Sequence, residues 1–368
     1  MVKRFRLVCT AAALVPLTLL AAACSSSSSA PAASKSSPAA AAANASGTSI
    51  TETGSTILFP LFGAWQTAYS TANPKVTITS GATGSGTGIT DAGEDLVNIG
   101  ASDAPLSASD LAKYPGLLNI PLTVAAIMVN YNLPGVKSLN LSGKVLAEIY
   151  TGKITTWNDP AIAALNPGAN LPSAKIVTLH RADSSGATFQ FGSYLNAQDP
   201  SLWPAADIGT TVTWPSVPGA VAETGNGGMV TGCAGIKDCI AYIGNSYEAK
   251  TDAAGLGQAS VANKAGKYTT ATPAAISAAL ASFPAVPAAG AEQLINTSAP
   301  TGYPIINYEY AIVKKTQPSA AEAKAIKAFL SWILTTGDTS KYLSATYGTA
   351  VPSATLSVSQ KLVSSLSG

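Results

Sequence analysis

The chain has few of the side chains on which metal sites and hydrolytic active sites depend. Its 368 residues include one histidine and four cysteines, and a metal site would need more ligands than these provide. The histidine, His180, lies in an apolar run beside Arg181, and the sequence contains no G-x-S-x-G nucleophile elbow. A structural role for His180 is favoured over a catalytic one. We expect no metal, no cofactor and no enzymatic activity.

Charge is also scarce: 11% of the residues are charged, and the formal net charge is +2. Without Lys3, Arg4 and Arg6, 18 of the 21 basic residues remain against 19 acidic ones, a net charge near −1. Since there is neither a positive surplus nor a run of Lys and Arg, the composition argues against nucleic acid as a partner. The apolar runs after the N-terminal region are too short, or too often broken by Gly and Pro, to span a bilayer.

The N-terminus is typical of a secretory signal, with basic residues, an apolar run over residues 7–23 and then Cys24. We predict a signal peptide at residues 1–23 and a lipid anchor on Cys24, which would hold the exported protein at the outer face of the cell membrane. The leucine of a lipoprotein cleavage box falls one position early, at Leu20, so lipidation is less firmly indicated than export. An uncleaved membrane anchor is the disfavoured alternative, because the run is short and contains Pro16.

The segment after Cys24 consists mostly of Ala, Ser and Pro with one charge, Lys35. This composition predicts a flexible tether over residues 24–47. The remaining residues, 48–368, are long enough for two domains. Within them five residues separate Cys233 from Cys239, and a small-loop disulfide is the natural interpretation in an exported protein, with a metal site as the alternative.

From residue 48 onward, short β-prone runs alternate with helical segments, which indicates α/β layers rather than a β-sandwich. We expect strands at residues 50–53, 75–79, 97–101, 122–130, 175–180 and 303–313. We expect helices at residues 59–69, 146–150, 159–165, 188–195, 274–283, 320–336 and 357–366. A glycine-rich loop is expected at residues 80–88. The apolar stripes of the helices are assigned to the core.

Three loops of small, hydroxyl- or glycine-bearing residues each follow a strand and precede a helix: residues 54–57, 84–88 and 184–187. Helix N-termini expose unpaired N–H groups, so three of them converging on one cleft would enclose an anion with little net charge. Arg181, with Asp183 two residues later, adds a planar donor fork suited to tetrahedral oxyanions. For each loop alone, ordinary turn and cap chemistry is the alternative.

Asp103 bears on the choice of anion. A carboxylate repels an oxyanion unless the ligand has a proton to donate, and hydrogen phosphate has such a proton whereas sulfate has none. Asp103 in an anion site would therefore favour protonated phosphate. The alternative is that Asp103 is an N-cap or turn residue before a helix that starts at Ser107.

Several further motifs follow one another in a recognisable order. They are residues 53–56 with Trp65, then 84–86, 100–106, 146–167, 180–186, 225–228 and 240–244. In these motifs the chain resembles the periplasmic phosphate-binding proteins, the PstS-like receptors of phosphate ABC importers. The resemblance implies an α/β, type II-like two-lobe periplasmic-binding-protein fold, each lobe a mixed sheet flanked by helices, with the ligand in the interlobe cleft. It places lobe I at residues 48–123 and 304–368 and lobe II at residues 124–303.

The resemblance also implies a set of phosphate ligands: Thr56, Ile57, Ser85, Asp103, Arg181, Ser185, Gly186 and Ala187, with Asp183 orienting Arg181. Two positions depart from the family pattern. Ile57 stands where an aromatic is common, which matters little if only its N–H is used. Ala187 stands where a threonine hydroxyl usually contacts phosphate, so one donor is missing, and Thr188 could replace it only if the backbone shifted.

The function that the resemblance implies is high-affinity binding of inorganic phosphate and its delivery to the permease subunits of an ABC importer, by a monomer. The first alternative is a protein of the same fold that scavenges or senses phosphate or another oxyanion without a transport role. The second is a secreted phosphoesterase or acyl hydrolase, for which the sequence has no base, metal cluster or nucleophile relay.

Overall fold

One path of hydrogen-bonded strands organises the part of the chain that the computed structural model describes, residues 47–368. The strands are β1 (Thr48–Gly54), β2 (Val76–Thr79), β3 (Ile99–Ser102), β4 (Leu117–Tyr131), β6 (Val177–Arg181), β7 (Val221–Glu223), β8 (Cys239–Gly244), β9 (Gly257–Gln258) and β12 (Ile306–Lys314). They follow the order β2-β1-β3-β12-β4-β8-β6-β7, and β9 pairs with β4. The predicted signal peptide and Cys24, with the tether up to residue 46, lie outside the described residues.

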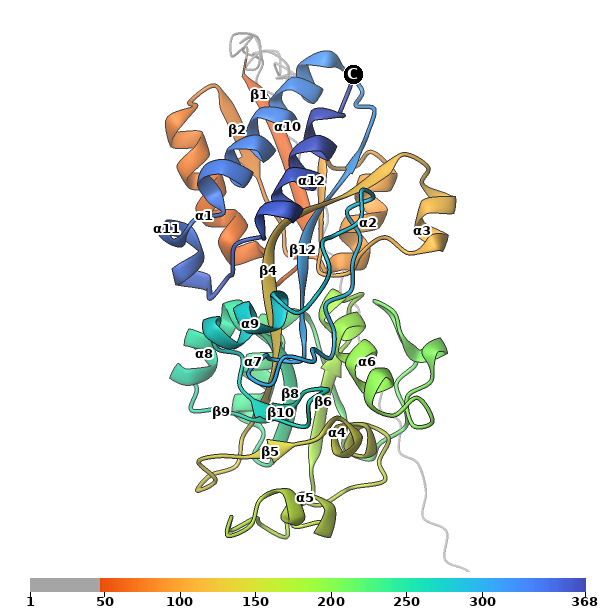
Figure 1. The fold of residues 1–368 in the computed structure, drawn as a ribbon, viewed down its shortest axis with the longest axis vertical. Coiled ribbons are helices and arrows are strands. Elements are labelled where there is room, and N and C mark those ends of the chain that lie inside the picture. Colours follow the sequence, from red (N-terminus) through yellow and green to blue (C-terminus); the bar gives the residue numbers. More distant parts are fainter. Residues whose placement is uncertain (1–46) are drawn as a thin grey trace, which may run out of the picture. The chain divides into compact units, whose positions relative to one another are not determined.

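The two ends of this sheet are parallel and its middle is antiparallel. β1 is parallel to β2 and β3, and β6 is parallel to β7 and β8, whereas β12 is antiparallel to β3 and β4. The first part of β4 pairs with β12 and its last part, residues 127–131, with β8, so β4 connects the two halves (Figure 1). The expected α/β fold with mixed sheets is confirmed. The lobe boundaries at residues 123/124 and 303/304 stay a prediction, because Ser46–Gly368 form one compact unit.

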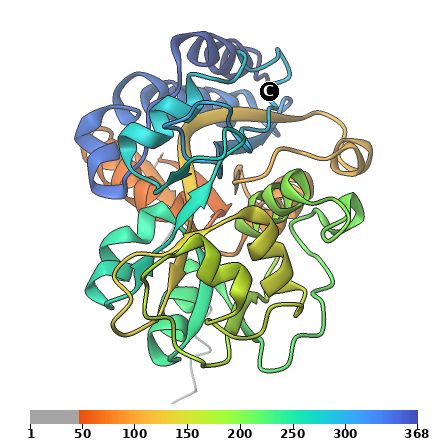
Figure 2. The same cartoon turned by 60° about the horizontal axis from the view of Figure 1, so that its bottom comes forward.

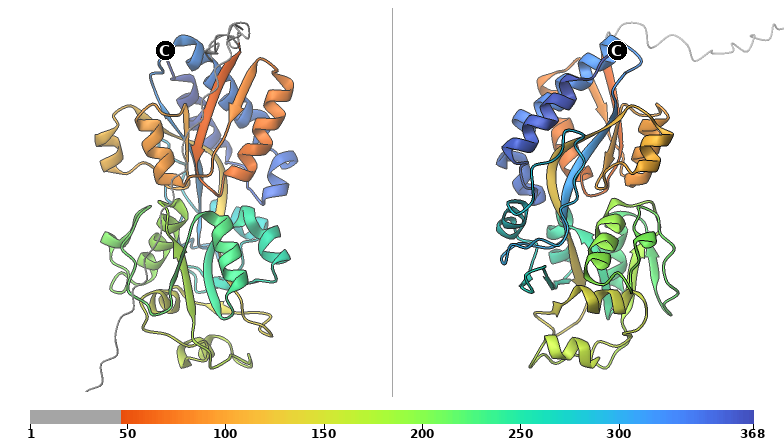
Figure 3. Two further views of the ribbon diagram at one scale, coloured as in Figure 1. Left: turned by 180° about the vertical axis from the view of Figure 1, so that it is seen from behind. Right: turned by 45° about the vertical axis from the view of Figure 1, so that its right-hand side comes forward.

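Helices cover both faces of the sheet. They are α1 (Phe59–Ala72), α2 (Ser85–Gly93), α3 (Ala108–Lys113), α4 (Gly143–Tyr150), α5 (Pro160–Leu165), α6 (Gly186–Gln198), α7 (Gly225–Gly235), α8 (Glu248–Ala253), α9 (Pro273–Leu280), α10 (Ala320–Trp332), α11 (Ser340–Leu343) and α12 (Ser353–Ser364). In the first half, α10 and α12 lie on one side of the sheet and α2 on the other (Figures 1 and 3). Over residues 47–368 no helix combines the length and the apolar character needed to cross a membrane.

The second half contains a further, small sheet. Its strands are β5 (Asn140–Leu141), β10 (Ser260–Ala262) and β11 (Tyr268–Thr269), in the order β11-β10-β5. The olive segment that carries α4 and α5 comes forward in Figure 2. In the same half, β6 pairs with β8 and ends at Arg181, in the second part of the site described below.

An aromatic cluster holds α1 on the first half of the sheet. The predicted stripe of Phe62, Trp65 and Tyr69 is buried, and the Phe62 ring lies edge-on to Phe329 of α10 with centroids 5.6 Å apart. The Trp65 indole N–H donates to the Gly337 carbonyl (2.9 Å), in a π-helical turn that replaces the last turn expected for α10. Because α1 is fixed in this way, the loop before it is held at the edge of the sheet.

Several helices begin earlier than expected, among them α4, α6 and α12. α6 begins at Gly186 rather than Thr188. α2 begins at Ser85, so the second part of the predicted glycine-rich loop is helical. Gly88 gives the reason: a Cβ there would come within 2.7 Å of the Ala101 carbonyl oxygen, so this glycine permits close helix–sheet packing and is not part of a flexible loop. The other expected strands and helices form, with shifted ends.

Candidate functional site

The three predicted loops meet at the carboxyl ends of strands, the edge at which α/β sheets commonly bind ligands. In the first half β1 ends at Gly54 and β3 ends just before Asp103, and in the second half β6 ends at Arg181. All the residues predicted to contact an anion are buried: Thr56, Ile57, Ser85, Asp103, Arg181, Ser185, Gly186 and Ala187. The structure thus brings together side chains that are far apart in the sequence.

The two halves touch at this site through glycines. The Gly86 N–H donates to the Ser184 carbonyl oxygen (3.2 Å). A Cβ on Gly186 would come within 2.6 Å of both the Asp103 Cβ and the Ser85 Oγ. Larger side chains at these positions would hold the halves apart, so the glycines permit an enclosed site.

Arg181 brings a buried guanidinium to the site, and Asp183 holds it as predicted. Nε donates to Asp183 Oδ1 (2.6 Å), and Nη2 is paired with Asp183 Oδ2. Burial acts to raise the pKa of Asp183, but the hydrogen bonds and charge of Arg181, with the Gly225 N–H (3.0 Å), lower it below its usual range. The third nitrogen, Nη1, is buried and finds no hydrogen-bond partner among residues 47–368. The site therefore contains a desolvated cationic donor that is free for an anion.

Asp103 is 1% exposed and belongs to the site. Its N–H donates to Ser85 Oγ (3.1 Å), and its Oδ1 accepts from Ser55 Oγ. The alternative that Asp103 is the N-cap of the following helix is wrong, because Ser107 is the N-cap of α3 and forms a capping box with Asp110. A role for the buried carboxyl as an anion ligand stays a prediction.

Thr56 and Ile57 occupy the turn between β1 and α1. The Thr56 Oγ1 accepts from the Asn226 N–H (3.3 Å) and side-chain amide (2.7 Å), which leaves its own hydrogen to donate. The Ile57 N–H, which we expected to face a ligand, donates to Ser55 Oγ (3.1 Å), as does the Leu58 N–H (2.9 Å). Its role as an anion donor stays a prediction.

The start of α6 provides backbone donors. Ser185 is the N-cap, and its Oγ accepts from the Thr188 N–H (3.4 Å). Gly186 and Ala187 lie in the first turn, where N–H groups have no intrahelical acceptor. The Thr188 hydroxyl is hydrogen-bonded to the Tyr242 hydroxyl of β8 (2.8 Å).

The sequence analysis missed three polar residues that support Asp103. The side-chain amides of Asn307 (2.8 Å) and Gln190 (3.1 Å) both donate to the Asp103 carbonyl oxygen. The Glu309 Oε2 lies within hydrogen-bond distance of Ser55 Oγ (3.0 Å), and Glu309 is buried. A signal for two of them was present, because Asn307 and Glu309 alternate within an apolar strand and so lie on one face of it.

His180 packs as a structural side chain. Its ring stacks on Trp214, with centroids 4.8 Å apart, and Nδ1 lies 3.3 Å from the Arg181 carbonyl oxygen. Burial lowers the pKa of His180, which favours the neutral ring. Among the described residues, no group of three or more His, Cys, Asp or Glu side chains gathers in a way that could hold a metal ion.

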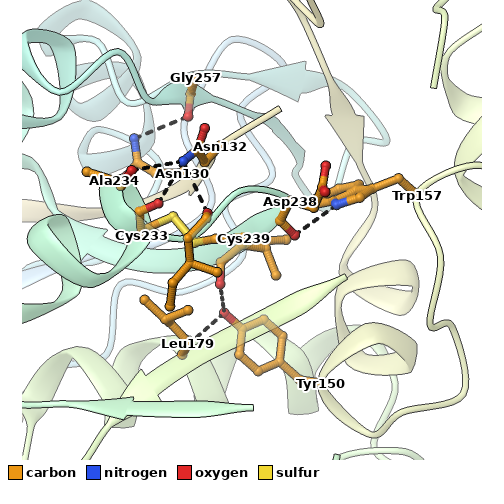
Figure 4. Close-up of a disulfide and its surroundings, with 12 residues drawn as sticks. Asn130, Asn132, Tyr150, Trp157, Leu179, Cys233, Ala234, Asp238, Cys239 and Gly257 are labelled. Carbon is orange, nitrogen blue, oxygen red and sulfur yellow. Dashed lines mark hydrogen bonds between the residues drawn. A yellow bond between two sulfur atoms is a disulfide. The ribbon is translucent and has the colours of Figure 1, made fainter. Parts of the chain in front are cut away.

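A disulfide joins Cys233 at the end of α7 to Cys239 at the start of β8 (Figure 4). The Asn132 side-chain amide donates to the carbonyl oxygens of Cys233 (2.9 Å) and Ala234 (3.2 Å), which secures the same helix end. The opposite end of α7 provides Asn226, the partner of Thr56. The predicted bridge therefore anchors a helix that reaches the site.

Comparison with known proteins gives consistent results. A family model described as a PBP superfamily domain matches residues 38–336. The phosphate-binding protein PstS of Pasteurella multocida (strain Pm70) is 33% identical over 294 residues, 78% of this chain and 83% of that protein. The PstS of Methanocaldococcus jannaschii is 34% identical over 320 residues, 81% of each chain. A high affinity periplasmic phosphate-binding protein (PfluDING), solved with phosphate bound, has the same fold, with a TM-score of 0.70 at 22% identity over 85% of this chain and 93% of its own.

Proposed function

Since the chain belongs to the family of PstS phosphate-binding proteins within the PBP superfamily, we propose that it binds inorganic phosphate and delivers it to the permease subunits of a phosphate ABC importer. The observation that carries this function is the Nη1 of Arg181, which is buried and has no hydrogen-bond partner within residues 47–368. A desolvated cationic donor without a partner is costly, and a phosphate oxygen would restore the missing charge-assisted hydrogen bond.

The proposed ligands are Thr56, Ile57, Ser85, Asp103, Arg181, Ser185, Gly186 and Ala187, with Asp183 orienting Arg181. The hydroxyls of Thr56 and Ser85 each accept from a protein N–H and keep a hydrogen to donate. The first turn of α6 adds backbone N–H groups at the positive end of a helix. These donors would surround a tetrahedral anion while only one cation faces it.

Asp103 would select phosphate by its protonation state. The Asp103 carboxylate can accept a hydrogen bond from the O–H of hydrogen phosphate. Sulfate has no such hydrogen, so its oxygen would lie against a buried like charge without a hydrogen bond. We therefore propose that the protein binds phosphate and rejects sulfate.

The lobe boundaries and the location of the protein are proposed on the same basis. Lobe I would comprise residues 48–123 and 304–368 and lobe II residues 124–303, because β4 exchanges its partner β12 for β8 after residue 126. The protein would be exported through the signal peptide at residues 1–23. A lipid anchor on Cys24 and a tether over residues 24–47 would hold it, as a monomer, at the outer face of the cell membrane. The protein would bind and release phosphate without catalysing a reaction.

Calorimetric titration of the purified, phosphate-stripped protein tests this function. We expect tight binding of phosphate and no competition from sulfate at equal concentration. Absence of phosphate binding would refute the proposal. Cells that lack the protein should also lose high-affinity phosphate uptake; unchanged uptake with intact binding would favour scavenging or sensing.

A further inference from the structure

Glu309 is a buried acidic side chain at the point where the two strands that connect the halves change register. On β12, Glu309 is opposite Thr123 of β4, whereas the next residue, Tyr310, is opposite Pro121. Such a bulge redirects neighbouring side chains and is frequent beside functional sites. Glu309 is 1% exposed, and its carboxyl contacts the Ser55 hydroxyl that also contacts Asp103. The site thus contains two carboxyls joined through one serine.

The contacts around Ser55 favour a proton on one of these carboxyls. The Ser55 oxygen accepts from the N–H groups of Ile57 (3.1 Å) and Leu58 (2.9 Å). It also lies within hydrogen-bond distance of Asp103 Oδ1 and of Glu309 Oε2 (3.0 Å). A serine hydroxyl has one hydrogen, so it can donate to only one carboxylate. The other contact would set two oxygens against each other unless the second carboxyl carries a proton.

The environments of the two carboxyls decide which one holds the proton. Asp103 has Ser55, Ser85 and the charge of Arg181 to stabilise its ionised form. Burial raises the pKa of both groups above their usual range. Ser55, Ser85 and Arg181 act against this rise at Asp103, whereas the charge of Asp103 raises the pKa of Glu309 further. The second oxygen of Glu309, Oε1, is buried and has no partner within residues 47–368. The proton therefore belongs on Glu309.

The remaining surroundings of Glu309 do not stabilise a second negative charge. A small cavity beside it is lined by uncharged residues of α1, β4 and the loops near residues 245 and 346, among them Leu61, Val124, Asn245, Ser246 and Thr346. The next residue, Tyr310, is a buried neutral phenol. The charged groups near it are Asp103 and, beyond it, Arg181 with Asp183. An ionised Glu309 would make three carboxylates against one guanidinium around a bound anion.

We propose that Glu309 is a positioning residue of the phosphate site: as a neutral acid it directs its hydrogen toward the Ser55 oxygen, so that Ser55 gives its one hydrogen to Asp103 and keeps that carboxylate aimed at the O–H of hydrogen phosphate. This inference rests on the proposed function. The acceptor for the phosphate proton is then one of two carboxyls that are joined through Ser55 and hold one proton between them: Asp103 contacts the ligand, and Glu309 acts through Ser55 and Asp103.

Two substitutions test the role of the Glu309 hydrogen. Glu309→Gln keeps a neutral donor and should bind phosphate somewhat more weakly than the parent. Glu309→Met keeps the volume but removes the donor, and should lose about tenfold or more in phosphate affinity, the usual scale for a charge-assisted hydrogen bond, with weaker rejection of sulfate. Tighter binding by Glu309→Gln would show that a negative charge had been removed and would overturn the proposal, as would parental affinity in Glu309→Met.

The matched control is Glu52→Gln. Glu52 is another buried acid of the first half, and its pKa is raised by burial to about 8. It does not contact Ser55 or Asp103, so phosphate affinity should stay at the parental value. Circular dichroism and melting temperature report whether each variant folds; if Glu309→Met does not fold, Glu309→Gln and the measurement below decide.

Infrared spectroscopy locates the proton directly. At neutral pH the carbonyl stretch of one protonated carboxylic acid should disappear in Glu309→Gln and remain in Asp103→Asn. The opposite pattern would place the proton on Asp103 and overturn the proposal. This measurement needs no ligand, so it separates the two failures: a parent that binds no phosphate refutes the proposed function, whereas a misplaced proton refutes only the role of Glu309.

Discussion

The two sides of the site are built in different ways. On the arginine side, the cation, its orienting carboxylate and the helix N-terminus all come from residues 181–188, which are contiguous in the sequence. On the carboxyl side, Asp103 lies 48 positions and Glu309 lies 254 positions from the serine that joins them. In the proposed site the first side would supply positive charge to any oxyanion. The second would discriminate among oxyanions by their protons, so attraction and selection would be separated in the molecule.

Removing the cation should have the largest effect. Arg181→Ala deletes the charged donor and leaves Asp183 half-buried without its partner, so phosphate affinity should fall by about 3 kcal/mol or more, roughly a hundredfold. Calorimetry measures the loss, and circular dichroism checks the fold. Lys153→Ala, at an exposed lysine of the same half, is the control and should bind as the parent does. Unchanged affinity in Arg181→Ala would contradict the assignment of the site.

Breaking the disulfide should lower the stability of the half of the protein that carries Arg181. A bridge across six positions lowers the conformational entropy of the unfolded chain, which raises the free energy of unfolding by roughly 2 kcal/mol. The double variant Cys233→Ala, Cys239→Ala should therefore denature at lower urea than the parent. Adding reductant to the parent is the matched control, because it opens the bridge and keeps both sulfurs. Two alkylated free thiols in mass spectrometry of the exported protein would refute the bridge.

Neutralising the carboxyl side should change selection more than affinity. Asp103→Asn keeps the shape, removes the repulsion, and can turn an N–H toward an unprotonated oxygen. Phosphate binding should survive with some loss, while sulfate gains about tenfold relative to phosphate, which corresponds to 1.4 kcal/mol. Competition titrations measure the ratio. A variant that still rejects sulfate as the parent does would remove Asp103 from the specificity argument.

The smallest effect is expected from restoring a donor on the arginine side. Ala187→Thr adds a hydroxyl at the start of α6, where the neighbouring Thr188 hydroxyl is hydrogen-bonded to Tyr242. Phosphate should bind a few-fold more tightly, as one additional hydrogen bond of about 0.5–1.5 kcal/mol implies. Ala187→Val has the same shape without the hydroxyl and should give no gain. Equal affinities in the two variants would mean that the added hydroxyl does not reach the ligand.

The sequence predicted local features well where neighbouring residues determine them. The strand before Arg181, the pairing of Asp183 with Arg181 and the short-range disulfide were all predicted and are present. Each depends on residues a few positions apart, whose geometry is limited by the local backbone. The prediction was less accurate at residues 85–88, where a run of glycine suggested a loop, because the packing of Gly88 against β3 comes from a distant strand.

What the sequence by itself determined is the arginine side, because residues within one loop meet whatever the rest of the chain does. Only the tertiary structure decided that Ser55, Asp103 and Glu309 share hydrogens, that the Ile57 N–H is taken by Ser55, and that Asn307 and Gln190 hold the Asp103 backbone. Contacts between distant strands depend on register, and a bulge at Glu309 alters that register by one residue. Since a shift of one residue turns a strand side chain to the opposite face, the partners of Glu309 could not be read from the sequence.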